Sequence, residues 1–269
     1  MQQGKVTIFG GGVMGETLLS GLIRAGRDVA DLQIAERRSE RAELLAERYG
    51  VSVVSNAEGA ETSSTLILVV KPQDISALLA EISGAIGNDA LVISLAAGVR
   101  TAFLEERLPP DTAVVRVMPN TPALVDEGMS AISPGSSCDA THLAEAEVLL
   151  AAVGRVLHVP ERQQDAVTAI SGSGPAYLFF VVEAMIEAGV HLGLPRKTAT
   201  DLAIQTSVGA AKMLRETGEH PSVLREQVTS PAGTTAAALR KLEDNAVRAA
   251  FLSALGAARD RSAELGDEG

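Results

Sequence analysis

The sequence predicts an α/β protein in which an N-terminal doubly wound sheet is followed by a C-terminal all-helical domain. Three observations predict this fold. A strand pattern near the N-terminus runs into a glycine-rich loop and then a helix. Short β-rich runs alternate with helical patterns up to about residue 160. Beyond that point only long, Ala-rich helical stretches follow. We therefore expect a dinucleotide-binding domain over residues 1–160 and a helical domain over residues 161–269.

The first predicted elements are a strand, a glycine loop and a helix. The strand Val6-Thr7-Ile8-Phe9 leads directly into Gly10-Gly11-Gly12-Val13-Met14-Gly15, and apolar residues at helical spacing follow. In this spacing the first glycine permits a sharp turn, the second lets backbone N–H groups approach a pyrophosphate, and the third lets the helix pack closely. Phe9 and the loop are thus predicted to form the pyrophosphate site of a Rossmann-like domain, with the anion at the helix N-terminus.

The next predicted strand, Leu32 to Ala35, ends at Glu36, which is followed by Arg37 and Arg38. A carboxylate about 20 residues past the loop usually accepts hydrogen bonds from the adenosine ribose of NAD. Neighbouring arginines would instead neutralise the extra phosphate of NADP. The same arginines can also be the solvated start of the next helix. These residues leave the choice between NADH and NADPH open.

The remaining strands of this half are predicted at Leu66 to Val70, Leu91 to Leu95, Val114 to Met118, Met129 to Ile132 and Val156 to Val159. The carboxyl ends of parallel strands form the ligand crevice of such sheets. Three loops begin at strand ends, and we expect them to shape a groove for ribose and nicotinamide: Val69-Val70-Lys71-Pro72, Leu95-Ala96-Ala97-Gly98 and Met118-Pro119-Asn120-Thr121-Pro122.

Two hydroxyl-rich segments of the helical half read as helix starts. In Thr229-Ser230-Pro231-Ala232-Gly233-Thr234-Thr235, Ser230 is a suitable N-cap and Pro231 suits the first helical position. Ser171-Gly172-Ser173-Gly174-Pro175 has the same design. Because the first amides of a helix have no partner within it, the two segments together are predicted to cradle a small anion.

Composition narrows the possible partners. The net charge is -11, which argues against a nucleic-acid partner because no basic stripe is present. The longest apolar stretch, residues 175–194, contains Glu183, Glu187 and His191, so we expect no membrane span. These three residues share one helix face and could hold a metal, but we expect an exposed or interface stripe and no metal site.

The composition also predicts how the protein assembles and in which cellular compartment it works. The helical half is rich in alanine, and aromatic residues make up 3% of the chain, so its helices should approach closely. We expect part of that surface to be buried against a second subunit in a homodimer. The single cysteine, Cys138, allows no disulfide within the chain, and a reduced cytoplasmic setting fits best.

The chain resembles the pyrroline-5-carboxylate reductases. The resemblance spans nearly the whole sequence and rests on motifs in the family's order: the glycine loop, Val70-Lys71-Pro72-Gln73, Ala96-Ala97-Gly98-Val99, Met118 to Pro122, Ser171 to Tyr177, Gly193 to Arg196 and Thr229 to Thr235. It implies reduction of the cyclic imine 1-pyrroline-5-carboxylate to L-proline with NADPH or NADH, the last step of proline biosynthesis. It also implies that the helical domain interlocks two subunits and that dimers sometimes assemble into larger rings.

The resemblance further implies roles for single residues. The substrate carboxylate should sit on the loop formed by Ser230 to Thr234, with Gly233 and Thr234 in contact, and the catalytic Thr235 should bond the ring nitrogen. Ser173 and Glu161 are further candidates for substrate binding, and Asn56 and Gln227 for cofactor binding. The family usually has glycine where Ala232 stands, so the backbone at Ala232 should be one that a Cβ tolerates. NADP-preferring members often have Ser or Asn where Glu36 stands.

Two alternatives remain at this point. β-Hydroxyacid dehydrogenases share the same two-domain plan and use a lysine as the base, a part that Lys212 would have to take. That reading leaves the loop Ser230 to Thr235 without a role. A nucleotide-sensing regulator, whose helical half binds a partner protein, would oxidise no cofactor at all.

Overall fold

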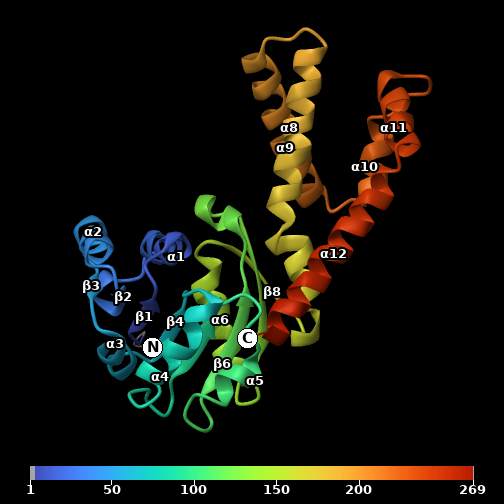
Figure 1. Cartoon of the computed structure of the whole chain (residues 1–269). Helices are drawn as coiled ribbons and strands as arrows, with labels where there is room; N and C mark the ends of the chain where they lie inside the picture. The colour runs from blue at the N-terminus through green and yellow to red at the C-terminus, as the bar shows by residue number, and fades with distance from the viewer. Residues whose placement is uncertain (1–3, 269) are drawn as a thin grey trace. The chain divides into compact units, whose positions relative to one another are not determined.

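The computed structural model describes residues 4–268, and the chain divides into two compact units (Figure 1). One unit comprises Met1–Ser173 together with Ala258–Gly269, and the other comprises Gly174–Ala257. The sequence placed a domain boundary after residue 160. The first compact unit extends past this predicted boundary to Ser173, and the helical segments η4 (Glu161–Gln163) and α7 (Gln164–Val167) after it contact β7 (Gly128–Pro134).

The first unit is built on an eight-stranded sheet in the order β3-β2-β1-β4-β5-β6-β7-β8. All neighbours are parallel except β6 and β7, which are antiparallel. The strands are β1 (Val6–Phe9), β2 (Leu32–Ala35), β3 (Ser52–Val53), β4 (Thr65–Leu68), β5 (Leu91–Ser94), β6 (Ala113–Met118), β7 (Gly128–Pro134) and β8 (Gly154–His158). The chain runs outward from β1 to β3 and returns to β4, so the topological switch point lies between β1 and β4.

The expected strands are confirmed at these positions with ends shifted by a few residues, and the two-residue β3 was not expected. Within the described residues no strand lies beyond His158. The doubly wound sheet followed by a mostly helical region is the fold that the sequence predicts.

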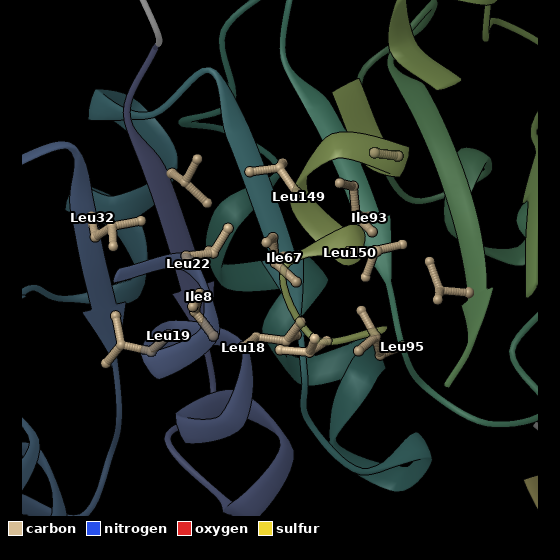
Figure 2. Close-up of a cluster of buried hydrophobic side chains, with 14 of the residues drawn as sticks. Ile8, Leu18, Leu19, Leu22, Leu32, Ile67, Ile93, Leu95, Leu149 and Leu150 are labelled. Atoms are coloured by element: carbon tan, nitrogen blue, oxygen red, sulfur yellow. The ribbon is translucent and has the colours of Figure 1, made fainter. Parts of the chain in front are cut away.

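Helices cover both faces of the sheet. Successive strand residues point to opposite faces, so Ile8 belongs to one buried cluster and Phe9 to the other. Figure 2 shows the first cluster, which includes Leu18 of α1, Ile67 of β4 and Leu149 of α6. The helices contributing to this cluster are α1 (Val13–Arg24), α2 (Ser39–Tyr49) and α6 (Ala140–Ala151). The second cluster is covered by α3 (Asn56–Thr62), α4 (Ile75–Ile82) and α5 (Thr101–Glu105).

Short helical turns complete the first unit. They are η1 (Val29–Asp31), η2 (Pro72–Asp74), η3 (Thr121–Val125), η4 (Glu161–Gln163), α7 (Gln164–Val167) and the π-helical turn η5 (Thr168–Gly172). A helix does start within Ser171 to Pro175, as predicted, because α8 (Gly174–His191) begins at Gly174. The Ser173 amide already donates to the Thr168 carbonyl at 2.8 Å, so this amide is not free for an anion. The π turn directly precedes α8, so this start lies inside a longer helical run.

The second unit contains the helices α8 (Gly174–His191), α9 (Arg196–Thr217), α10 (Pro221–Gln227) and α11 (Thr234–Asp244), together with most of α12 (Val247–Glu268). A four-residue connection joins α8 to α9, and the two helices pack against each other. The apolar side chains of Leu178, Phe179 and Phe180 on α8 are each about two-thirds exposed within the chain. Contiguous exposed apolar surface of this kind marks an interaction site.

By length and composition alone, the helical run Glu161–His191 could cross a membrane, with a hydropathy of 1.4 in its most apolar window. Only 6% of that window is buried inside the chain. High hydropathy and low burial within the chain are also expected of a helix that a partner subunit covers. These two properties therefore do not by themselves identify a membrane segment.

Candidate active site

The glycine loop joins β1 to α1 in the way its spacing predicts. Gly10 has a φ of 108°, a conformation that favours glycine, and a Cβ there would lie 2.7 Å from the Val69 carbonyl oxygen. A Cβ on Gly15 would overlap the Gly10 carbonyl, so only glycine lets α1 approach the loop this closely. Gly12 is the N-cap of α1, and a Cβ there would meet nothing within 4 Å. The open space beside Gly12 is therefore available to a ligand.

A cavity of about 480 Å³ lies at this end of the sheet. Nine of the predicted cofactor residues line it: Phe9, Gly10, Gly12, Glu36, Arg37, Asn56, Val69, Val70 and Lys71. Six further lining residues were not among the predicted cofactor residues: Ala35, Arg38, Gln73, Asp74, Leu78 and Glu81. Ala35, Arg38 and Gln73 adjoin predicted residues in sequence, and Asp74 lies two residues after Pro72. Leu78 and Glu81 sit on α4 and reach the cavity only through the packing of that helix.

The Glu36 carboxylate is fixed by four hydrogen bonds at the edge of this cavity. It accepts from the Gly11 amide at 2.9 Å, from the Arg38 amide at 3.0 Å and from the Arg38 guanidinium at 3.0 and 3.1 Å. Its side chain is 8% exposed. Burial raises the pKa of Glu36, but the bonds from Arg38 and Gly11 outweigh burial and lower this pKa from 4.5 to about 2. Glu36 is therefore an anion at neutral pH.

The neighbouring polar side chains of the cavity are also paired. Arg37 lies 3.2 Å from Asp74 in an ion pair between the end of β2 and η2. The Asn56 amide donates to Glu81 at 2.6 Å, which links α3 to α4. These pairs hold the cavity wall in shape before any ligand is present.

Beneath the loop, Arg41 of α2 donates to the Gly11 carbonyl at 2.7 Å and pairs with Glu16 of α1. Burial raises the pKa of Glu16, but its bonds from Arg41 and Tyr49 and the charge of Arg48 lower this pKa overall. This network ties α1 and α2 to the glycine loop.

The other predicted cofactor residues of the first unit lie at the same sheet edge but do not line this cavity. Because β4, β5 and β6 are parallel, the loops that follow them lie at one edge of the sheet, as expected. Pro72 and Ala97 line a neighbouring hollow of about 650 Å³. Leu95 and Ala96 are buried, and Gly11, Val13, Met14 and Gly15 are loop or helix residues outside the cavity lining.

The amide of Asn120 is already engaged at both ends. It donates to the Ser171 carbonyl at 3.3 Å and to the Ser171 hydroxyl at 3.2 Å, and it accepts from the Met129 amide at 2.8 Å. These bonds tie the loop after β6 to the π turn and to β7. A role of Asn120 in cofactor binding stays a prediction.

Glu161 is likewise engaged within the first unit. Its carboxylate accepts from the Thr101 amide and hydroxyl, both at 2.8 Å, and lies 3.2 Å from Arg116, whose side chain is 7% exposed. The carboxylate therefore satisfies the start of α5 and a buried guanidinium. Its predicted contact with substrate stays a prediction beside this structural role.

The predicted substrate loop precedes α11 in the second unit. Ser230 to Gly233 form a turn closed by the Gly233 amide, which donates to the Ser230 carbonyl at 3.0 Å. The prediction that Ser230 caps the helix is wrong, because Gly233 is the N-cap and α11 begins at Thr234. No side chain caps this helix, so the amides of its first turn lack a side-chain partner within the described residues. Thr235 is half-buried in that first turn, and Ser230 is exposed.

Ala232 has a φ of 54°, in the left-handed region that favours glycine. The backbone there accommodates a Cβ, as expected, but in a conformation that costs free energy. Gly is usual here in the family that the sequence resembles, and the alanine carries a strain of about 1 kcal/mol. The turn before α11 keeps its shape despite this cost.

Other candidates of the second unit have ordinary surface partners. Glu187 forms two bonds to Arg196, at 2.8 and 3.3 Å, and the described residues include no group of three or more His, Cys, Asp or Glu side chains that could hold a metal. Lys212 is 60% exposed and lies 3.6 Å from Glu216. Gln227 is the last residue of α10 and is exposed.

Comparison with family models gives two matches. Residues 161–265 match the model described as pyrroline-5-carboxylate reductase dimerisation. Residues 5–98 match the model described as NADP oxidoreductase, coenzyme F420-dependent. The two models together cover the glycine loop and the loop before α11.

Comparison with known proteins gives full-length similarity. The pyrroline-5-carboxylate reductase of Corynebacterium melassecola is 48% identical over 265 residues, which cover 97% of this chain and 98% of the relative. The solved structure of a pyrroline-5-carboxylate reductase from Coxiella burnetii is similar with a TM-score of 0.94 and 38% identity, covering 98% and 99% of the two chains. The pyrroline carboxylate reductase of Plasmodium falciparum, solved with NADP bound, is similar with a TM-score of 0.88, 29% identity and 99% coverage of both chains.

Proposed function

This chain belongs to the pyrroline-5-carboxylate reductase family, and from that premise we propose that it reduces 1-pyrroline-5-carboxylate to L-proline with NAD(P)H. The observation that supports this most directly is the similarity over 97% of the chain, which includes both the glycine loop and the loop before α11. It is an NAD(P)H-dependent oxidoreductase that forms a homodimer through its helical domain.

The cavity beside Gly12 fits a dinucleotide. The space that a Cβ on Gly12 would fill is open, the α1 N-terminus faces it, and the lining follows the switch point of the sheet. The bound cofactor supplies a hydride to the imine carbon. The chain's own part is to hold the pyrophosphate with amides of the α1 N-terminus and the adenosine ribose near Glu36.

The turn from Ser230 to Gly233 and the start of α11 fit the substrate carboxylate. The first amides of α11 have no side-chain cap, and hydroxyls of Ser230 and Thr234 stand beside them. Donors of this kind bind a carboxylate without a cationic side chain. We assign carboxylate binding to Ser230, Gly233 and Thr234.

Thr235 is placed one residue into α11, where its hydroxyl can donate to or accept from the ring nitrogen. Reduction leaves a secondary amine, so the nitrogen must be held in the protonated state during the transfer. A protonated imine already attracts hydride, so the residues act chiefly by orienting the two reactants and by excluding water. No strongly basic dyad is required of the chain.

We propose further that the dimers assemble into a larger ring and that the enzyme works in the cytoplasm. The exposed apolar face of α8 supports burial between subunits, and a single cysteine per chain suits a reducing compartment. Multi-angle light scattering gives the assembly mass, and the mass of a lone dimer at micromolar concentration would contradict the ring.

The test of the proposed reaction is a cofactor-oxidation assay followed at 340 nm with purified full-length protein. We expect oxidation of NADH or NADPH with 1-pyrroline-5-carboxylate and formation of L-proline in equal amount. In the reverse direction, reduction of NAD(P)⁺ with 3-hydroxy acids would indicate a β-hydroxyacid dehydrogenase instead. No turnover with either substrate class would favour a regulator and would overturn the proposal.

A further inference from the structure

We propose that this chain binds NADH in preference to NADPH and that Glu36 sets the preference. The inference rests on the proposed function, since it concerns the cofactor of the same site. It goes beyond the general use of NAD(P)H by naming the cofactor and the residue that selects it.

The first observation is the placement of the Glu36 carboxylate. Glu36 follows β2 directly and lines the same cavity as Gly12. Its two oxygens are oriented by the Gly11 amide and by Arg38, so the side chain cannot swing away without breaking its bonds to the backbone amides of Gly11 and Arg38. A fixed carboxylate at this position can accept hydrogen bonds from the ribose hydroxyls of NADH.

The second observation is that the same carboxylate opposes an added phosphate. The 2′-phosphate of NADPH carries between one and two negative charges at neutral pH and would stand beside the ionised Glu36. Like charges brought together in a partly desolvated site cost binding free energy. Displacing Glu36 would in turn leave the Gly11 amide without its partner.

The third observation is that the nearby arginines are already neutralised. The Arg38 guanidinium binds Glu36 through Nε and one terminal nitrogen, and Arg37 pairs with Asp74 at 3.2 Å. The remaining charged groups of the lining are Lys71 and Glu81, so the cavity wall carries cations and carboxylates in equal number. A phosphate would have to compete with existing carboxylates for each guanidinium.

The test is direct binding of NADH and NADPH to the full-length protein without substrate, followed by the fluorescence of the reduced cofactor. We expect a Kd for NADH at least about tenfold lower than that for NADPH. Glu36→Gln removes the charge and keeps an acceptor for the Gly11 amide, so it should reduce the preference about tenfold or more. Glu43→Gln, an equal charge change on the exposed face of α2, should leave the ratio unchanged.

A wild-type protein that binds NADPH as tightly as NADH would overturn the proposal, as would an unchanged Kd ratio in Glu36→Gln. If circular dichroism shows that Glu36→Gln is unfolded, Asp74→Asn provides the second variant. Freeing Arg37 from Asp74 should tighten NADPH binding relative to NADH, and no change there would contradict the charge argument. These binding measurements need no imine, so they are independent of the cofactor-oxidation assay that tests the proposed reaction. If the proposed reaction is wrong, the protein would still bind the cofactor but would show no turnover of the imine.

Discussion

The Glu36 carboxylate accepts a hydrogen bond from the Gly11 amide at 2.9 Å, which joins the end of β2 to the glycine loop that follows β1. One amide of the loop is thereby used within the protein. The amides at the start of α1 remain to face a pyrophosphate. The ionisation of Glu36 is consequently coupled to the shape of the loop.

This coupling predicts a specific pH dependence of stability. The pKa of Glu36 falls from 4.5 to about 2 in the folded state, so its stabilising contribution is present above pH 4.5 and is lost as the pH falls toward 2. Glu36→Gln should lose less free energy of unfolding than the wild type over this interval. Urea unfolding at a series of pH values measures the difference. Parallel curves for the two proteins would show that the carboxylate is not stabilised by its bonds.

Gly15→Ala should disrupt the loop. Its Cβ would overlap the Gly10 carbonyl, so α1 must move away from β1, at a cost of about 1–3 kcal/mol and with weakened cofactor binding. Gly84→Ala is the control, because a Cβ there meets nothing within 4 Å. Thermal unfolding and cofactor titration on both variants check this. Equal behaviour of the two would mean that the close approach of α1 to the loop is unimportant.

Thr235→Ala should lower kcat by about 10²-fold, because the hydroxyl that holds the proton at the ring nitrogen is removed. Thr235→Ser keeps the hydroxyl and should restore most of the rate. Steady-state kinetics with varied imine measure both variants. A rate in Thr235→Ala equal to the wild-type rate would remove this residue from the mechanism.

Ala232→Gly should relieve the left-handed backbone at φ 54° and stabilise the protein by up to about 1 kcal/mol. Ala246 has the same φ of 54° outside the substrate loop, so Ala246→Gly is a matched control. Both should raise the midpoint of thermal unfolding, but Ala232→Gly alone should change the KM for the imine. An identical KM in the two variants would indicate that the turn shape does not affect substrate binding.

Glu161→Gln separates a structural role from substrate binding. The variant weakens the contacts to Thr101 and leaves Arg116 without a charged partner, so unfolding should become easier by about 1–3 kcal/mol. If the carboxylate acts only in this way, the KM for the imine should stay near the wild-type value at temperatures where the variant is folded. A large rise in KM with unchanged stability would instead establish the predicted contact with substrate.

The sequence predicts the sheet and the glycine loop well because these elements carry local signals. The strands are short runs of buried apolar residues, and the glycines at positions 10 and 15 are required by close backbone approach. β3 escaped prediction because two exposed residues, Ser52 and Val53, form no recognisable pattern. These two residues form a strand because their backbone pairs with β2.

The errors fall where tertiary packing overrides local propensity. Ser230 and Pro231 have the residue types of a helix start, yet the turn through Ala232 moves the start of α11 to Thr234. Ser171 and Ser173 lie in and just after a π turn that precedes α8, so the Ser173 amide bonds to the Thr168 carbonyl and is not left for an anion. The roles of Glu81 and Leu78 in the cavity depend on where α4 docks, which no local pattern of residues encodes.

The most direct test of the central claim is a crystal structure of the full-length protein with oxidised cofactor and L-proline bound. We predict the adenosine ribose beside Glu36, the pyrophosphate at the amides that begin α1, and the proline carboxylate on the loop of residues 230–234 and the first amides of α11, with Thr235 at the ring nitrogen. Proline bound at a site remote from residues 230–235, or a cofactor outside the cavity beside Gly12, would contradict the account.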